Sequence, residues 1–429
     1  MTDAAATRSI LRDPIFARLW FIQAATQVGG NMALFALTVL VFDTTRSNTA
    51  VGLLVASFVL PQIVLSPFAG VVVDRLDLRW ALVGPNIARA VLTAGLALAG
   101  ANVPMLLALN LGVSLTSVAL TPAEGSMIPR VVPRAQLQSA MGIFNLTLQA
   151  SFALGFAFLG PLLVTIAGPS AVLAVVTALY VAATVACIGL PSAPPNRGAL
   201  ESGRDAGMRV IHELREGIGV IRGDREVSRP ILHQAAGASV AGVLGVLGPG
   251  LVITIGLQPS QLAVIVVPLG IGVVIGVLGL RRFGHHISHR RAAEGGHIVL
   301  GLLTASLALA GWLGGVLAGY GVSVLPFVVT VAICAGAAYA VVSVSAQTAL
   351  LESMPSQVRG RVFGVLASIV SAASLAPTLI AGPLADRVSA TLVIGIVGIA
   401  VVLVGVWSAW FFGPKKGEAG PGGTPAGGD

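Results

Sequence analysis

The chain has 429 residues, of which 55% are hydrophobic and only 10% are charged. Soluble domains average about 25% charged residues, so a soluble fold of this length could not cover its surface, and the mean hydropathy of +0.92 agrees with this exclusion. The formal net charge is +8. Most of the apolar mass is Ala, Val, Leu and Gly, a mixture that suits helices packed closely inside a bilayer.

Twelve apolar runs are long enough to cross a membrane, because a transmembrane helix needs about 20 residues to span roughly 30 Å of hydrocarbon. The runs lie at 17–42, 49–73, 81–100, 104–123, 138–164, 169–190, 231–256, 259–280, 297–318, 322–348, 363–384 and 388–412. A membrane β-barrel is excluded, because it would show alternating hydrophobicity in segments of about ten residues. The sequence therefore predicts an all-α integral membrane protein with twelve transmembrane helices.

Basic residues are distributed unevenly among the loops. If the N-terminus is cytoplasmic, 22 of the 25 Lys and Arg residues lie in cytoplasmic segments, Arg46 and Arg387 lie outside, and Arg89 lies within a span. The positive-inside rule therefore predicts a multi-pass protein of the cell inner (plasma) membrane with both termini in the cytoplasm. Basic loops that face an anionic inner leaflet explain the high pI without nucleic acid as a partner. We expect a monomer.

The spans fall into two sets of six. The predicted segments are a cytoplasmic N-terminal segment (1–16), an N-terminal six-helix half (17–190), a cytoplasmic linker (191–230), a C-terminal six-helix half (231–412) and a disordered cytoplasmic tail (413–429). No cleavage site follows the first segment, so we expect it to be retained. In the linker, Ile211, Leu214, Ile218 and Ile221 recur at helical spacing among arginines. This pattern predicts an amphipathic helix on the inner leaflet or, alternatively, a helix that binds a partner.

The two halves share sequence features. Glu124-Gly-Ser-Met-Ile-Pro129 precedes span 5, and Glu352-Ser-Met-Pro355 precedes span 11. Spans 5 and 11 then carry Gly160-Pro161 and Gly382-Pro383. Together these features suggest duplicated halves related by an axis along the membrane normal, an arrangement found in secondary transporters.

The loop between spans 2 and 3 reads Gly70-Val-Val-Val-Asp74-Arg75-Leu-Asp77-Leu-Arg79. Gly70 would let two helices approach closely, and Asp74, near the start of span 3, would meet a positive helix end. Arg75 and Arg79 could reach carboxylates or helix C-termini on neighbouring helices. We expect this cluster to act as a latch that holds one half against the other and releases it. The alternative is a loop that only satisfies the positive-inside rule.

This loop resembles the signature G-x-x-x-D-R-x-x-R-R of the major facilitator superfamily, and the resemblance extends from about Ile10 to Phe412. It implies the major facilitator fold, with two pseudo-symmetric six-helix halves. Within the superfamily, the chain is similar to the branch that includes the bacterial enterobactin exporter and related drug exporters. The matching segments are Phe16-Ala-Arg18-Leu19-Trp20, Leu60-Pro61 with Ser66-Pro67, Asn86-x-x-Arg89-Ala90, and Arg359-Gly-Arg361-Val-Phe363-Gly364.

Span 5 partly matches a motif that the family associates with antiporters, through Gly155 and Gly160-Pro161. This match implies export, although a Gly-Pro pair in a transmembrane helix can also be an ordinary kink. We assign Gly160, Pro161, Glu124 and Arg359 to the same gating set as the loop between spans 2 and 3.

The 17 acidic residues fall in loops, in tails or at span ends, so we expect none inside the membrane. Proton coupling needs a group that binds and releases a proton during the transport cycle. The remaining candidates are Asp43 and Glu124 at span ends, His233, and the substrate itself; otherwise transport is uncoupled. Asn31 and Asn86 stand where relatives often carry aspartate, which weakens the expectation of proton antiport.

Arg89 is a further possible coupling residue, about eight residues into span 3. A charge at the bilayer centre costs about 2.5–3.5 kcal/mol on insertion scales. We therefore expect a structural partner, snorkelling to the surface or a role in binding.

No cofactor or metal site is predicted. Cys187 and Cys334 lie in apolar runs and should be small buried side chains. His285, His286 and His289 lie in a loop rich in arginine, which would repel a cation.

Polar side chains inside spans are the candidate substrate contacts. They are Gln23, Gln27 and Asn31 on span 1, Asn145 and Gln149 on span 5, and Gln234 beside His233 at the start of span 7. Spacing of four residues places the members on span 1, and likewise those on span 5, on one helix face. The alternative is hydrogen bonding between helices and, for His233, an ordinary helix-end residue.

The sequence favours a secondary transporter that exports a small amphipathic organic molecule, such as a drug, siderophore or metabolite, by alternating access. The apparent lack of an intramembrane acid favours an anionic or neutral substrate. The alternatives are a lipid or lysolipid translocator, an uncoupled facilitator, and a non-transporting sensor or scaffold. An enzyme is not expected, because no nucleophile–base or metal-ligand spacing occurs, and no GxxxxGK[ST] loop for ATP is present.

Overall fold

The computed structural model describes residues 10, 12–194, 219, 225–283, 288–320, 322–353 and 359–411. All regular secondary structure in this part of the chain is helical. The amphipathic linker helix expected around 211–221 and the predicted tail lie outside the described residues.

The first half of the chain forms one helical bundle. Its elements are α2 (Pro14–Thr45), α3 (Asn48–Val73), α4 (Leu78–Leu98), α5 (Val103–Ser117), α6 (Leu120–Val131), η1 (Arg134–Gln136), α7 (Leu137–Phe152), η2 (Ala153–Leu159) and α8 (Gly160–Ile188). The first helix, α2, packs against α8, which also packs against α4. These contacts join spans 1, 3 and 6 into one unit.

The second half forms another bundle. Its elements are α10 (Arg225–Thr254), η4 (Pro259–Leu262), α11 (Ala263–Phe283), α12 (His289–Ser306), η6 (Leu307–Leu309), α13 (Ala310–Ala318), α14 (Leu325–Ser353), α15 (Arg359–Arg387) and α16 (Ala390–Phe411). The helix α14 packs against both α11 and α12. The first helix of this half begins at Arg225, six residues before the predicted domain boundary at 231.

The described helices confirm twelve spans. Ten helical stretches are long and apolar enough to cross a membrane. One of them, Arg134–Ile188, is two spans, because Gly168 (φ 81°) turns the chain back inside α8. A positive φ is readily adopted only by glycine, which has no Cβ. The remaining span is α15, whose 29 residues also suffice to cross the bilayer.

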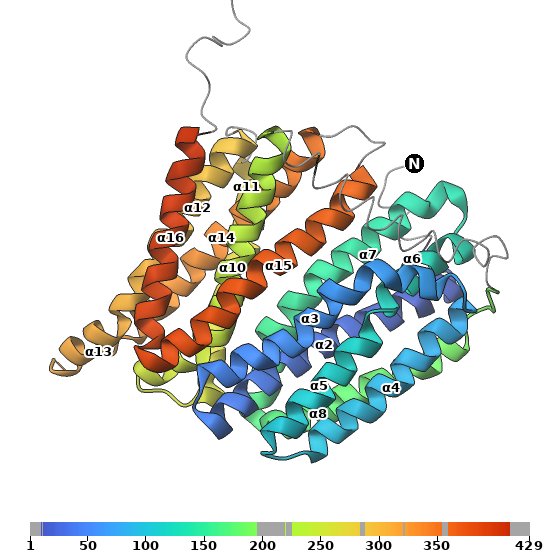
Figure 1. Cartoon of the computed structure of the whole chain (residues 1–429), viewed down its shortest axis with the longest axis horizontal. Helices are drawn as coiled ribbons and strands as arrows, with labels where there is room; N and C mark the ends of the chain where they lie inside the picture. The colour runs from blue at the N-terminus through green and yellow to red at the C-terminus, as the bar shows by residue number, and fades with distance from the viewer. Residues whose placement is uncertain are drawn as a thin grey trace, which may run out of the picture.

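The two bundles meet near one end (Figure 1). We call this the Arg46 end, because it carries Arg46 and the end of α15; the opposite end, which carries Arg75 and Leu190, is called the linker end. In Figure 1 the bundles converge where α3 begins and α15 ends, and they diverge toward the linker end. The most extensive contacts between the halves pair α3 with α15 and η2 with α11.

Buried apolar side chains follow the same division. Near the Arg46 end, one cluster contains residues of both halves, including Phe35 and Phe42 from α2 and Val246 and Leu251 from α10. A second cluster, which includes Phe16, contains side chains of the first half alone. A third contains side chains of the second half alone. Apolar side-chain packing therefore joins the halves at one end and is confined to each half at the other.

Glycine permits the closest packing within the second half. A Cβ on Gly272 of α11 would collide with the backbone carbonyl oxygen of Ile333 on α14, and one on Gly336 of α14 would collide with the carbonyl oxygen of Leu269. Helices in a bilayer gain little from the hydrophobic effect between them, so association depends on such close van der Waals contact.

We predict that Gly272→Ala destabilises the protein by about 1–3 kcal/mol, because overpacking forces backbone shifts of this cost. Gly279→Ala on the same helix is the matched control, since a Cβ there would meet no heavy atom within 4 Å. Thermal unfolding in detergent should show a lower Tm for Gly272→Ala and an unchanged or higher Tm for Gly279→Ala. Equal Tm values for the two variants would contradict the packing.

Candidate functional site

Asp77 caps the start of α4. One carboxylate oxygen accepts a hydrogen bond from the backbone N–H of Arg79 at 2.9 Å, and Ser192, which follows α8, donates its hydroxyl to the other. The N–H of Leu78 also donates to the carbonyl of Ala193 at 3.0 Å. Burial would raise the pKa of the Asp77 carboxyl, but the hydrogen bonds outweigh it and lower this pKa below its ordinary value. The turn after α3 is thus fixed to the segment that leaves the same half.

The prediction that Asp74 meets the start of the next helix is wrong. Helix α3 continues to Val73, so Asp74 lies exposed at its C-terminal end, and Asp77 takes the capping position. The close helix approach predicted at Gly70 is also absent here, because a Cβ on it would meet no heavy atom within 4 Å. The sequence could not separate the two aspartates, since both precede the apolar run of span 3.

The expected latch is not engaged within the described part of the chain. Arg75 is exposed, and the guanidinium carbon of Arg79 lies 5.5 Å from the ring centroid of its neighbour Trp80. Arg359 begins α15, but its side chain lies outside the described residues. The latch formed by Asp74, Arg75, Arg79 and Arg359 therefore stays a prediction.

Span 5 contains a π-helical turn, η2, between Phe152 and Gly160. A Cβ on Gly155 would lie 2.5 Å from the carbonyl oxygen of Val28, and one on Gly160 would lie 3.1 Å from the Cβ of Phe35. Glycine therefore lets span 5 lie directly on span 1. Pro161 is buried in the next turn. π-Helical turns are rare and often mark functional segments, so this observation adds to the motif that the sequence singled out.

The same turn touches the other half. A Cβ on Gly270 of α11 would lie 2.9 Å from the Cβ of Ala157. Gly155, Gly160 and Ala157 therefore lie where spans 1, 5 and 8 meet, which is one of the two seams between the bundles. When one half moves against the other, the helices of spans 1, 5 and 8 must therefore shift relative to each other at this seam.

The polar residues of span 1 do not all behave alike. Gln23 is buried, and its Nε2 donates to the carbonyl of Phe144 on span 5 at 3.1 Å. Gln27 and Asn31 are half-buried, and Asn31 Nδ2 donates to the carbonyl of Gln27 at 2.9 Å. Gln23 thus makes the interhelical hydrogen bond that was the alternative, whereas Gln27 and Asn31 keep accessible surface. Asn145 on α7 is exposed; the side chain of Gln149 lies outside the described residues.

Arg89 is buried, so the snorkelling alternative is wrong. Its Nη2 donates to the hydroxyl of Tyr180 at 2.7 Å and to the carbonyl of Thr26 at 3.3 Å. The guanidinium carbon also lies 4.1 Å from the Tyr180 ring centroid, a cation–π contact. Arg89 therefore ties span 3 to spans 1 and 6. Its Nε has no hydrogen-bond partner among the described residues.

Glu124 lies inside a span, which corrects the prediction that no acid does. Span 4 was expected to end at 123, but α6 continues it to Val131, and Glu124 is only 4% exposed. Pro122 lies in the first turn of α6, where a missing N–H costs nothing, so the helix continues past it. Arg89 is close enough to act electrostatically on Glu124, although no ion pair within 4 Å joins them among the described residues.

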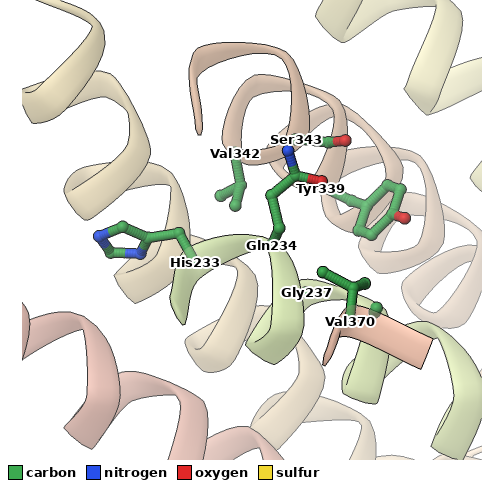
Figure 2. Close-up of a pocket in the computed structure, with 8 residues that line it drawn as sticks. His233, Gln234, Gly237, Tyr339, Val342, Ser343 and Val370 are labelled. Atoms are coloured by element: carbon green, nitrogen blue, oxygen red, sulfur yellow. The ribbon is translucent and has the colours of Figure 1, made fainter. Parts of the chain in front are cut away.

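A pocket in the second half contains Gln234 (Figure 2). It is lined by His233, Gln234, Gly237 and Ala238 of α10, Tyr339, Val342 and Ser343 of α14, and Val370 of α15. Figure 2 shows Gln234 between Tyr339 and Ser343, and His233 directed to the other side of α10. Sequence reasoning missed Tyr339 and Ser343, although a polar side chain inside an apolar span was the signal that identified Gln234.

The coupling candidates other than Glu124 have local partners. His233 is buried; its Nδ1 lies 3.2 Å from Nδ1 of His297, and its Nε2 lies 3.1 Å from the hydroxyl of Ser408. His233 is thus no ordinary helix-end residue, since it joins spans 7, 9 and 12. Its partner His297 was not predicted from the sequence. Asp43 forms an exposed ion pair with Arg46 at 2.9 Å within its own half.

Comparison with known proteins settles the family. The sequence profile of the Major Facilitator Superfamily matches residues 19–377. The chain belongs to the major facilitator superfamily. The resemblance found in the sequence is therefore confirmed, and the family is one of transporters rather than enzymes.

Curated relatives agree with this assignment. The chain is 26% identical to macrolide efflux protein A of Streptococcus pyogenes over 87% of this chain and 90% of that protein. It is 24% identical to the uncharacterized MFS-type transporter YfiS of Bacillus subtilis, over 87% of each protein. An uncharacterized MFS-type transporter of Mycobacterium tuberculosis is 33% identical, but the match covers 34% of this chain and only 36% of that protein.

Solved structures agree on the fold. The nucleoside transporter NupG matches 94% of this chain and 100% of its own with a TM-score of 0.71 at 12% identity. The D-xylose-proton symporter matches 94% of this chain and 99% of its own with a TM-score of 0.69 at 13% identity. The major facilitator fold and a multi-pass membrane protein are thus shown, and a transporter of this family acts on a small molecule.

We predict that Asp77→Ala lowers the unfolding free energy by about 1 kcal/mol, the usual cost of losing a helix cap. Asp74→Ala should leave it unchanged, because the exposed Asp74 side chain caps no helix in this structure. Thermal unfolding in detergent distinguishes the two, and a larger loss for Asp74→Ala would contradict the assignment.

The pH dependence of this effect follows from the lowered pKa. The stability that Asp77 contributes is fully present above the unfolded-state pKa of about 3.9 and is lost as the pH falls through the lower folded-state value. The Tm difference between wild type and Asp77→Ala should therefore stay constant from about pH 8 to pH 5 and shrink only in stronger acid. A difference that grows on acidification would contradict the prediction.

Proposed function

We propose that this protein is a secondary active transporter that exports a small amphipathic organic molecule by alternating access. The observation that carries the proposal is the arrangement of the two halves, which share one apolar core at the Arg46 end and have separate cores toward the linker end. Such a protein can open one end while the other is closed. The similarity to a protein named for macrolide efflux supports export.

The linker end is proposed to face the cytoplasm, because most of the basic residues near described span ends, among them Arg75, Arg130 and Arg282, lie at this end. The described conformation is then open to the inside. In it, Asp74 and Arg75 are exposed and Gly70 has empty space around it. The latch and the close approach at Gly70 are therefore proposed to form only after the linker end closes, when α15 comes near α3 there.

Glu124 is proposed to bind the coupling proton. It is an acidic side chain buried inside a span, and Arg89, held by Tyr180 and Thr26, lies in electrostatic range. A carboxylate and a fixed guanidinium attract each other only while the carboxylate is ionised. Gain and loss of a proton would therefore change the force between spans 3 and 4 during each cycle. Asp43 and His233 have local partners that suit structural roles better.

Substrate contacts are proposed at Gln27 and Asn31 in the first half and at Gln234, Tyr339 and Ser343 in the second. These side chains are uncharged, and their surroundings are mostly apolar, as expected of a site for amphipathic organic molecules. The expected preference for anionic or neutral substrates depended on the absence of an intramembrane acid. Glu124 removes that basis, so the proposal includes cationic compounds.

Reconstituted vesicles test the transport proposal. A radiolabelled macrolide and a panel of other amphipathic compounds should accumulate against their gradient in inside-out vesicles when a pH gradient is imposed. Movement of fluorescent lysolipids without movement of any of these compounds would favour lipid translocation. Absence of any movement would contradict the proposal.

Glu124→Gln should abolish accumulation driven by the pH gradient and leave exchange of labelled for unlabelled substrate intact, because the variant keeps the side-chain volume and loses only the titratable group. Asp43→Asn is the matched control and should behave like wild type, since Asp43 is exposed at the Arg46 end. Gradient-driven accumulation that survives Glu124→Gln would exclude Glu124 as the coupling group.

A further inference from the structure

The carboxylate of Asp386 joins the two halves at the Arg46 end. Asp386 lies in the last turn of α15, and the groups that donate hydrogen bonds to its carboxylate in the described part of the chain belong to the first half. One oxygen, Oδ1, accepts from the backbone N–H of Asn48 at 2.8 Å and from Asn48 Nδ2 at 2.9 Å. The other, Oδ2, accepts from Ser47 Oγ at 2.7 Å, from the N–H of Thr49 at 3.0 Å and from Thr49 Oγ1 at 2.6 Å.

These donors form the start of α3, which explains why they are available. The first N–H groups of a helix have no acceptor within the helix, and this end carries a partial positive charge. Ser47 is the N-cap and accepts from the N–H of Ala50 at 3.3 Å. Its hydroxyl hydrogen is then free to point at Asp386. The cap of α3 is therefore completed by a side chain that lies more than 330 residues further along the chain.

Two glycines bring the backbones close enough for this contact. A Cβ on Gly382 of α15 would lie 2.7 Å from the carbonyl oxygen of Asn48, and one on Gly250 of α10 would lie 2.9 Å from Asn48 Oδ1. Asn48 itself is only 7% exposed. The start of α3 is thus held in a recess of the second half, with Asp386 facing it.

Asp386 stays ionised over a wide pH range. Burial would raise its pKa, but the hydrogen bonds from Ser47, Thr49 and Asn48 outweigh burial and lower the pKa well below its ordinary value. The other charged groups nearby are Arg387 and the exposed pair of Asp43 and Arg46. The hydrogen bonds to the Asp386 carboxylate therefore persist between neutral and moderately acid pH. They break when the two halves separate at this end.

The corresponding place in the other half is built differently. If the two halves are duplicates, span 8 in the second half corresponds to span 2 in the first. The first turn of span 8 is η4. There Gln258 and Gln261 cap the turn from within the same segment. Only the seam between α3 and α15 therefore carries a charged cap supplied across the halves in the described part of the chain.

We propose that Asp386 is a conformational latch that keeps the Arg46 end closed and must release the start of α3 when that end opens. The inference rests on the proposed alternating access. The latch predicted in the loop between spans 2 and 3 lies at the linker end. Asp386 would be its counterpart at the Arg46 end. Loss of the carboxylate shifts the population toward conformations that are open at the Arg46 end.

Distances between spin labels test the latch. Labels on Thr44→Cys and Val388→Cys, two exposed positions of opposite halves, report the width of the Arg46 end in a background with Cys187→Ala and Cys334→Ala. Double electron–electron resonance on the full chain in lipid nanodiscs measures the distance between the two labels. Wild type should show mainly the short distance that corresponds to a closed Arg46 end. Asp386→Ala should increase the ratio of long to short distances by about tenfold or more, as expected for losing several hydrogen bonds to a charged acceptor.

Asp43→Asn is the matched control, because it removes a carboxylate at the same end that contacts only its own half; its distance distribution should equal that of wild type. Should Asp386→Ala fail to fold, the double variant Ser47→Ala with Thr49→Val removes two of the five donors, both hydroxyl groups, from the other side and should shift the distances in the same direction. An unchanged distribution in these variants overturns the latch.

Two further outcomes separate the latch from the proposed function. Glu124→Gln, which cannot bind the proposed coupling proton, should keep the short distance at both pH 7.5 and pH 5; a long-distance population that grows at pH 5 in this variant would contradict a latch with a lowered pKa. If transport substrates shift wild type between the two distances but Asp386→Ala has no effect, alternating access stands and the latch fails. If wild type shows one distance under every condition, both fail.

Discussion

A bilayer offers no hydrogen-bond partner to a polar group, and this constraint organises the whole molecule. Backbone polarity is satisfied inside helices, so the chain can cross the membrane only as closed helical segments. Polar side chains then have three places to lie: inside a bundle, between the two halves, or at the ends. Arg89 and Glu124 lie inside the first bundle, the pocket around Gln234 lies in the second, and Asp386 lies at the seam.

The close packing of this protein depends on glycine more than on shape-matched large side chains. At the seams and within the second half, added Cβ atoms would collide with the neighbouring backbone. Helices that touch through glycine can slide or tilt with few side chains to rearrange. The π-helical turn at Ala153–Leu159 contains Gly155 and lies where spans 1, 5 and 8 meet, so close contact through glycine also occurs at that seam. A transporter of two moving halves needs seams of this kind.

Hydropathy was enough to predict the spans and the two halves, because these depend on composition averaged over about 20 residues. The family followed from the resemblance of the loop between spans 2 and 3 to the superfamily signature. Single residues near span ends were harder. Glu124 was predicted to lie at the end of span 4, because the apolar run that marks this span ends at residue 123, whereas α6 continues to Val131. The capping role was predicted for Asp74 and belongs to Asp77, because the cap is the residue just before the first helical residue, and the sequence did not fix where α4 begins.

Contacts between distant segments were beyond the sequence. The pairing of His233 with His297 and the hydrogen bonds of Asp386 to Ser47, Asn48 and Thr49 depend on how whole helices are placed. No local pattern in a single sequence records such a pairing. Asp386 was predicted only as one of the acidic residues at span ends, and only the structure gives it five donors from the other half.

The central claim is that the two halves expose one site alternately to the two sides of the membrane. A cysteine at Gln27, half-buried on span 1, tests it most directly in a background without the native cysteines. Its reaction with a membrane-impermeant thiol reagent is measured from each side, in right-side-out and inside-out vesicles, with and without a transported compound. The account predicts reaction from the linker side at rest and added reaction from the Arg46 side during transport. Reaction from one side only, under every condition, would contradict it.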